Sequence, residues 1–443
     1  MKRIRYIWFL ILAFILNFNG IGAQEAVVDS VNTEKADTTN VEASDSIGMN
    51  LRVTLITCDP GPDAYQMFGH TAIRVQDLNN PDYDMVYNYG VFDSRRNNFI
   101  YYFVKGETDY VLSVNHADQF IGRYRDHFGI QMYEQELNLT AEEKENLTYL
   151  LEENARPENR TYRYNFLYDN CTTRAVHIIE KAVEESGGKV AYQQHDAAYE
   201  ETTFRDILHR FTAVTPWMEF GIDFVLGAEV DKKRDYKEQM FIPSVYEAEL
   251  DAATISDDSG MSRKIVGQKG TIAPTTGKEE SRSFPLSPLA TFTIVLVFTF
   301  ILCVFDLKRG KLSLWADITG LFLRGLAGFL VAFLFFFSEH PAVGSNWLVL
   351  AFNPLFFIMI PDLIYAVSQK KYMAKVKIKG LKYDAFELVN LSVLIFTLLM
   401  FVLPIQSLHI AMLPLVLTLL IRSITRIILL NKKVNAIKLI KKS

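Results

Sequence analysis

The chain has 443 residues, of which 49% are hydrophobic and 13% aromatic, and a net charge of −5. This composition excludes a disordered chain, a collagen-like chain and a protein that coats nucleic acid. The charge is divided unevenly, because residues 1–285 hold 29 Lys and Arg against 45 Asp and Glu whereas residues 286–443 hold 17 against 6. We therefore expect the two parts of the chain to lie in different surroundings.

Residues 1–23 predict a secretory signal, because they begin with three basic residues, continue with an apolar run and end in small residues. The signal is either cleaved after Ala23 or retained as an anchor. Residues 24–50 are polar and hold six acids against one lysine, so they predict a disordered tether.

Residues 51–250 predict a globular α+β domain. Apolar alternation predicts strands within the stretches 53–57, 70–75, 85–92, 98–104 and 110–114, and helices are expected over 140–155 and 171–186. Residues 251–285 contain few large apolar side chains, and we expect a linker or flexible loop there.

The last part of the chain predicts an all-α membrane domain of five transmembrane helices. Each of five apolar runs is about long enough to cross a hydrocarbon layer of roughly 30 Å; they are 286–305, 318–337, 347–367, 388–405 and 408–430. Lysines and arginines follow the first and third runs and close the chain, whereas the loop 338–346 has none. By the positive-inside rule, the C-terminus is expected in the cytoplasm and the α+β domain in the periplasm of a bacterial inner membrane.

Two motifs in the α+β domain carry residues suited to thiol chemistry. His70 stands at the start of a predicted strand, and Cys171 follows Asp169-Asn170 at the start of a predicted helix. A helix N-terminus lowers the pKa of a thiol, and a thiol nucleophile works beside an imidazole that takes and returns its proton. Taken one at a time, each residue is more often structural; together they predict a Cys–His site.

A third polar group is expected to orient the imidazole. If residues 70–75 and 85–91 form an antiparallel hairpin with its turn in 77–82, His70 lies opposite residue 89 or 90. Asn88 is then one step from the required place, with Asp93 as the alternative.

Five further residues are candidates for substrate contacts. Cys58 lies in a Pro- and Gly-rich stretch and either lines the site, is inert or pairs with Cys171 in a disulfide. Arg174 is expected to bind either a phosphate head group or an acidic residue of its own domain. Arg324 stands within an apolar run, where a charge usually has a partner or faces a cavity; its candidate partners are Asp317, a lipid phosphate and carbonyls of neighbouring helices. The remaining two are His340 and Asn353, beside the outer loop. The three cysteines lack the paired spacing of a zinc site, so we expect neither a metal nor a cofactor.

The order of these motifs resembles the circularly permuted papain-like fold of the NlpC/P60 and lecithin:retinol acyltransferase groups. Four segments more closely resemble the DUF4105, or Lnb, family of Bacteroidota, and they are 55–61, 68–75, 88–93 and 169–174. The short stretches 339–341 and 353–355 resemble the same family. The resemblance implies a lipoprotein N-acyltransferase. Such an enzyme moves an acyl chain from a phospholipid, through a cysteine thioester, to the α-amine of a diacylated apolipoprotein.

Two other functions are compatible with the same residues. The first is a papain-like cysteine peptidase or amidase that acts on cell-wall peptides, although a soluble substrate requires no five-helix membrane domain. The second is a membrane sensor or scaffold with an inert Cys–His pair, although the cytoplasmic loops are short and no output domain follows them.

Overall fold

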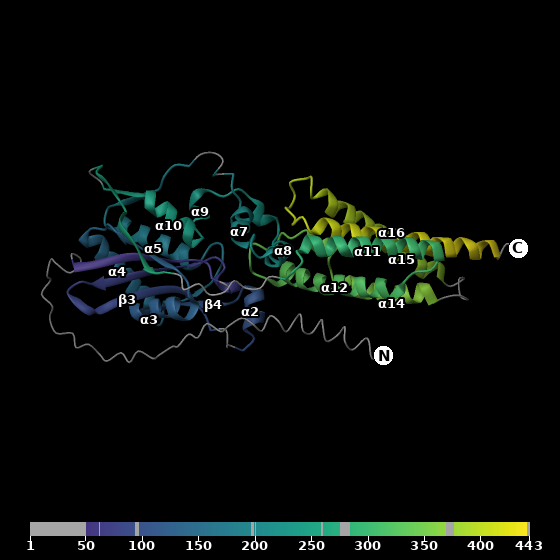
Figure 1. Cartoon of the computed structure of the whole chain (residues 1–443), viewed down its shortest axis with the longest axis horizontal. Coiled ribbons are helices and arrows are strands. Elements are labelled where there is room, and N and C mark those ends of the chain that lie inside the picture. Colours follow the sequence, from purple (N-terminus) through teal and green to yellow (C-terminus); the bar gives the residue numbers. More distant parts are fainter. Residues whose placement is uncertain are drawn as a thin grey trace. The chain divides into compact units, whose positions relative to one another are not determined.

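The computed structural model describes residues 50–440 except 62, 94–96, 196–198, 200, 258–259, 275–283 and 369–375. The predicted signal and the predicted tether up to residue 49 lie outside the described residues. The chain divides into two compact units (Figure 1). The first contains the residues up to Thr202 together with Arg234–Ser281, and the second contains Thr203–Lys233 together with the chain from Arg282.

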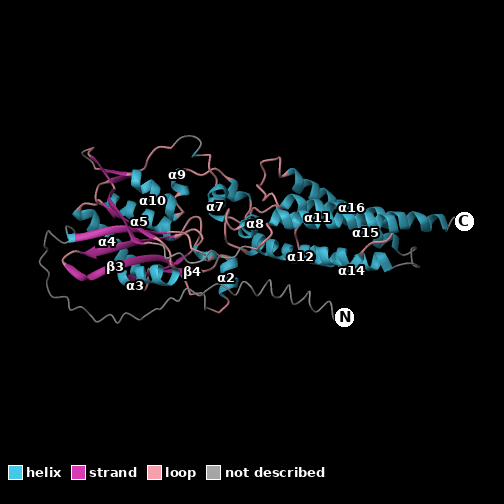
Figure 2. Cartoon of the chain, in the orientation of Figure 1, coloured by secondary structure: helices cyan, strands magenta, loops and turns pink. Residues whose placement is uncertain are grey.

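A seven-stranded antiparallel sheet forms the centre of the first unit (Figure 2). The strands lie in the order β10-β5-β1-β2-β3-β4-β6. Their bounds are β1 Leu51–Cys58, β2 His70–Asp77, β3 Asn80–Val91, β4 Asp109–His116, β5 Met132–Leu137, β6 Thr161–Arg163 and β10 Val266–Ala273. A smaller sheet contains β7 Lys189–Ala191, β8 Thr254–Ser256 and β9 Ser262–Lys264.

Both faces of the large sheet are covered by helices, because successive side chains of a strand point to opposite faces. Leu55 and Ile73 pack with α4 (Ala141–Ala155) and α5 (Cys171–Glu185). Ile56 and Ala72 pack with α3 (Ala117–Gly122) and the π-helical turn η4 (Arg123–Phe128). The other short elements of this unit are η3 Ala64–Gln66, α9 Tyr236–Gln239 and α10 Pro243–Ala252. The α+β class predicted from the sequence is confirmed.

Two stretches of the first unit differ from the prediction. Residues 98–104, predicted as a strand, form most of helix α2 (Phe99–Lys105), which Gly106 ends in a left-handed conformation at φ 79°. A short aromatic run fits a strand or a helix equally well, and the glycine after it favours the helix. The predicted linker 251–285 is wrong for residues 254–273, which form β8, β9 and β10. β10 pairs with β5 and so forms an edge of the large sheet.

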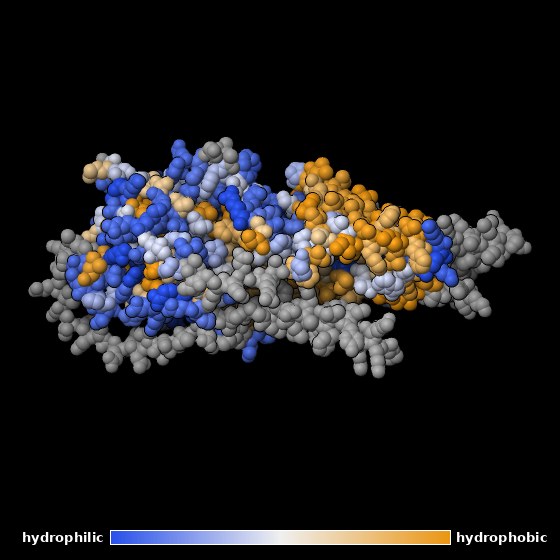
Figure 3. All heavy atoms as spheres, viewed as in Figure 1, coloured by the Kyte–Doolittle hydropathy of each residue, from blue (hydrophilic) through white to orange (hydrophobic). Residues whose placement is uncertain are grey.

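The second unit contains the apolar helices (Figure 3). Within the described residues, three helices are long and apolar enough to cross a membrane by length and composition, and they begin at Pro288, Leu314 and Met412. Two shorter apolar stretches cover Leu348–Ile364 and Phe386–Leu399. The predicted third span is divided into two helices at Asn353-Pro354. The helices are α11 Pro288–Arg309, α12 Leu314–Phe337, α13 Leu348–Ala351, α14 Leu355–Ser368, α15 Val376–Leu399 and α16 Met412–Ile440.

Residues 203–233, predicted as part of the domain 51–250, belong to the second unit. They form α7 (Phe204–Thr212), α8 (Pro216–Val225) and η5 (Ala228–Asp231). The buried side chain of Asn346 donates to the carbonyls of Phe224 and Val225 at 2.9 and 3.2 Å. Gln406 donates to the Leu226 carbonyl at 3.1 Å. These bonds attach the segment to two loops between the apolar helices. No local sequence pattern indicates this attachment.

Buried ion pairs connect the apolar helices. Arg422 of α16 donates to Asp306 of α11 at 2.7 Å and to Asp317 of α12 at 2.6 Å. Arg426 pairs with Asp317 at 3.1 Å and with Glu387 of α15 at 2.8 Å. The two arginine side chains are 7% and 6% exposed and the three acids at most 2%. Since each charge has a partner, the helices can hold charged groups inside an apolar unit.

Candidate active site

Helix α5 begins at Cys171 because Asn170 caps it. The Asn170 side-chain oxygen accepts from the N–H groups of Thr172 and Thr173 at 2.8 and 2.9 Å. Its amide nitrogen donates to the carbonyls of Phe166 and Phe241 at 2.7 and 2.8 Å. The buried asparagine is therefore fixed on both sides, and it holds the first turn of α5, and with it Cys171, in one position.

His70 and Asn88 lie side by side on neighbouring strands. The register pairs Ile73 with Tyr87 and Arg74 with Val86, so its continuation brings His70 opposite residue 90, as predicted. Both residues point to the same face, and His70 Nε2 lies 2.6 Å from Asn88 Oδ1. The side chain of Asn88 thus holds the imidazole through Nε2, and the other ring nitrogen can face the thiol.

Gly90 allows the close approach of α5 to the sheet. It sits at a register irregularity of β3 and has φ +88°. A Cβ there would lie 3.5 Å from Cys171 Cβ and 3.8 Å from His70 Cε1. The thiol, the imidazole and Asn88 are therefore brought together, as the two sequence motifs predict.

The thiol and the imidazole each stabilise the charged form of the other. Burial raises the pKa of Cys171, but the charge of His70 and hydrogen bonds from His70, the Thr71 N–H and Thr172 outweigh it, so the pKa is lowered. Burial lowers the pKa of His70, but the charge of Cys171 and hydrogen bonds with Cys171 and Asn88 outweigh it, so this pKa is raised. The site favours a thiolate–imidazolium pair, which is the reactive form of a cysteine nucleophile.

We expect alkylation of Cys171 by iodoacetamide to continue to lower pH than alkylation of an ordinary thiol, because only the thiolate reacts. The rate should fall as the pH decreases through the lowered pKa of Cys171. In His70→Ala the midpoint of this profile should move to higher pH, because burial then acts without the imidazolium charge. The profile is obtained by mass spectrometry of the alkylated peptide. Equal midpoints in wild type and His70→Ala would contradict the coupling of the two groups.

Sequence reasoning missed two tyrosines at the site. The ring of Tyr124 from η4 stacks on His70, with ring centroids 6.0 Å apart. Tyr162 of β6 is buried, and its hydroxyl lies 4.0 Å from the Cβ position of Gly90. This hydroxyl makes no hydrogen bond with the described residues that meets ordinary distance and angle limits. A buried hydroxyl beside the nucleophile, close to the Gly90 N–H, is a feature that only the folded chain reveals.

Cys58 and Arg174, two of the residues predicted to contact substrate, instead contact residues of their own domain. Cys58 pairs with His70 across β1 and β2, but its thiol is free and 1% exposed. The disulfide with Cys171, one of the three alternatives for Cys58, is absent, and burial raises the pKa of Cys58 well above its usual value. Arg174 forms two hydrogen bonds with Asp169, at 2.6 and 2.8 Å, and its guanidinium lies 3.6 Å from the ring centre of Tyr162. Arg174, fixed by Asp169, therefore packs against the Tyr162 ring.

The other three predicted residues lie in the second unit. Arg324 donates to the Ala351 carbonyl at 2.7 Å and stacks on Phe356 at 3.7 Å; the partners of Asp317 are Arg422 and Arg426 instead. Asn353 binds backbone groups between α13 and α14. His340 lies in the loop after α12 and donates its N–H to Ser338.

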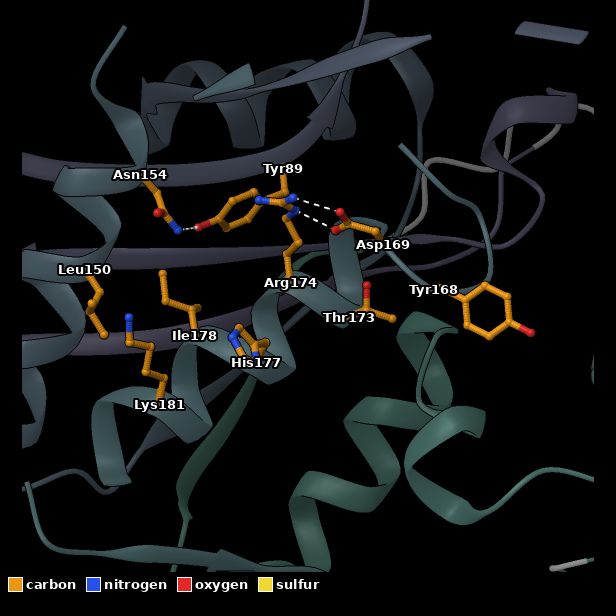
Figure 4. Close-up of a pocket in the computed structure, with 10 residues that line it drawn as sticks. All are labelled: Tyr89, Leu150, Asn154, Tyr168, Asp169, Thr173, Arg174, His177, Ile178 and Lys181. Atoms are coloured by element: carbon orange, nitrogen blue, oxygen red, sulfur yellow. Dashed lines mark hydrogen bonds and ion pairs between the residues drawn. The ribbon is translucent and has the colours of Figure 1, made fainter. Parts of the chain in front are cut away.

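A cavity of about 570 Å³ lies along the flank of α5 (Figure 4). Its wall contains Arg174, His177 and Lys181 of α5, with Leu150 and Asn154 of α4 facing them. Neither Cys171 nor His70 lines it, so we place the reactive centre at the Cys–His pair and not in this cavity. Among the described residues, no group of His, Cys, Asp and Glu is arranged to hold a metal ion.

The fold and the site define a class of membrane protein in which an α+β domain with an activated Cys–His pair precedes a helical transmembrane domain. Comparison with family models agrees with this class. Residues 42–209 match the Lnb N-terminal periplasmic domain, and residues 278–434 match the Lnb transmembrane domain. The chain belongs to the Lnb family. Searches of curated proteins and of solved structures find no match.

Proposed function

We propose that this protein is a lipoprotein N-acyltransferase of the bacterial inner membrane, with its α+β domain in the periplasm and its C-terminus in the cytoplasm. The observation that carries the proposal is the coupled Cys171–His70 pair in a periplasmic-type domain of the Lnb family. A thiol can hold an acyl group as a thioester, so transfer between two lipids requires neither a nucleotide nor a cofactor. The donor is a phospholipid, and the acceptor is the α-amine of a diacylated apolipoprotein.

In the first step, the Cys171 thiolate attacks the carbonyl carbon of a phospholipid ester. The C–O bond to the glycerol breaks, and His70 gives its proton to the departing oxygen, so that a lysophospholipid leaves. Asn88 holds the imidazole through Nε2 during this transfer. The products are an acyl thioester on Cys171 and a neutral His70.

In the second step, the α-amine of the apolipoprotein attacks the thioester carbon. His70 takes a proton from the amine, the C–S bond breaks, and the thiolate of Cys171 is restored. Both steps pass through an oxyanion. Since Asn170 occupies the N–H groups of Thr172 and Thr173, the Cys171 N–H is the helix donor that remains, and the Tyr162 hydroxyl is the second donor.

The test is mass spectrometry of the N-terminal peptide of a resident lipoprotein. Cells that lack this protein should carry two acyl chains on that peptide, and cells complemented with the wild-type chain should carry three. Lipoproteins that remain triacylated in the deletion strain would overturn the proposal.

Tyr162→Phe should lower acyl transfer by about 10²- to 10³-fold, the usual effect of removing one oxyanion donor. The rate of Cys171 alkylation should stay at the wild-type value, because alkylation forms no oxyanion. Burial raises the pKa of Tyr162, so the group is a neutral phenol that donates. Both rates are measured on the same purified variant.

Tyr89→Phe is the matched control, because its hydroxyl accepts from Asn154 at 2.9 Å, away from the thiol. We expect it to transfer acyl groups within about threefold of wild type, since a neutral hydrogen bond contributes roughly 1 kcal/mol. Equal losses in the two variants would contradict the role of the Tyr162 hydroxyl as an oxyanion donor, because both substitutions keep the ring and remove only the hydroxyl.

A further inference from the structure

Helix α2 exposes an aromatic and aliphatic face to its surroundings. Ile100, Tyr101 and Phe103 are 61%, 50% and 45% exposed, and none of the seven residues of α2 is buried. The helix itself contains no acid, and its last residue, Lys105, forms an ion pair with Glu107 just beyond its end. An exposed apolar surface of this kind marks a contact with a partner or with a membrane.

The place of α2 in the fold puts it at the catalytic end of the sheet. Because β2 and β3 are antiparallel, the start of β2 at His70 and the end of β3 at Val91 lie at the same end, and α2 follows β3. Leu78, in the turn between these strands, lies at the opposite end, roughly 25 Å away for eight residues at about 3.3 Å each. It is also 62% exposed, and it therefore provides a matched position for comparison.

A row of aromatic rings connects α2 with the reactive centre. Phe92 follows Gly90 by two residues, and its ring stacks on Phe99 of α2 with centroids 5.2 Å apart. Phe99 in turn lies 6.0 Å from Phe103. Gly90 borders both Cys171 and His70. Aromatic side chains thus extend from the exposed face of α2 to Phe92, two residues after the glycine that borders the thiol.

We propose that α2 inserts its exposed face into the outer part of the lipid bilayer and that the acyl chain of the donor leaves the bilayer along Phe103, Phe99 and Phe92. The bilayer is the partner favoured by the chemistry, since tyrosine rings beside aliphatic groups suit the boundary between head groups and acyl chains. The same chain carries membrane-spanning helices, so a bilayer is always present. The route of the acyl chain rests on the proposed function, whereas the insertion of α2 does not.

Insertion is tested on the full chain in lipid nanodiscs. In a Cys171→Ala background, Tyr101→Cys is labelled with the fluorophore NBD, and Leu78→Cys is labelled in the same way. Exchange of the lipids for 5-doxyl phospholipids should quench NBD at 101 by about twofold or more, as for a group at the acyl boundary, and should leave NBD at 78 unchanged. Equal, weak quenching at both positions would overturn the proposal, as would a blue-shifted but unquenched signal at 101, which indicates a protein partner.

The route is tested by the double substitution Ile100→Gln and Tyr101→Gln. The ratio of the acylation rate with phospholipid vesicles to that with a soluble p-nitrophenyl ester should fall by about tenfold, because polar side chains weaken burial in lipid. Leu78→Gln should keep the wild-type ratio. A wild-type ratio in the α2 variant overturns the route. A wild-type protein that reacts with the soluble ester but never with phospholipid overturns the proposed function and leaves the quenching result intact.

Discussion

Replacing Cys171 with alanine is expected to abolish transfer of an acyl chain from phospholipid to a diacylated lipopeptide, with a loss of about 10⁴-fold or more, as when the nucleophile of a covalent enzyme is removed. The α+β domain should remain folded, since α5 keeps its cap at Asn170 and the side chain is only partly buried. The rate is measured with purified protein in detergent–lipid micelles. In the wild type without acceptor, a hydroxylamine-labile acyl group should accumulate on the peptide that contains Cys171.

The matched control is Cys58→Ala, which removes the neighbouring thiol. Cys58 is 1% exposed, so it is closed to a lipid ester, and burial raises its pKa well above the usual value. We expect this variant to accumulate the thioester on Cys171 and to keep most of its transfer activity. Accumulation of the acyl group on Cys58 in the wild type or in Cys171→Ala, or equal losses of transfer in both variants, would contradict the assignment of Cys171 as the nucleophile.

The core of the site was predictable because each of its parts has a local signal. The cap at Asn170 and the strand that begins at His70 are both readable within a few residues. The hairpin joins them to Asn88, since a short turn fixes the register of two strands. The α+β class and the apolar helices also have local signals, because the pattern of apolar residues along the chain is enough to predict them.

What could not be predicted depends on distant parts of the chain. Tyr162 approaches Gly90 only because β6 joins the edge of the sheet beside β4, and Arg174 then stacks on its ring. β10 looks like a linker because its pairing with β5 crosses more than a hundred residues. For Arg324, a carbonyl of a neighbouring helix was one of three predicted partners, but its position in an apolar run does not indicate that this carbonyl belongs to Ala351.

The largest loss of stability is expected for Arg422→Met, in the buried ion pairs of the second unit. The substitution leaves Asp306 without its buried cation and weakens the pairing of Asp317, which keeps only Arg426. Removing one partner of a buried ion pair costs about 3–5 kcal/mol, because an unpaired charge stays behind in an apolar interior. The variant should show a strongly lowered unfolding temperature in detergent, measured by the loss of monodisperse protein after heating.

Two further variants separate the effect of the Arg422 charge on stability from the effect of its side-chain packing. Arg309→Met removes the second partner of Asp306, but Arg309 is 43% exposed, so we expect a loss of at most about 1 kcal/mol. Adding Asp306→Asn to Arg422→Met should recover part of the stability, because it neutralises the charge that lost its partner. The two substitutions should therefore cost less together than the sum of their separate effects. Strict additivity would mean that Arg422 stabilises the helices through packing and not through its ion pairs.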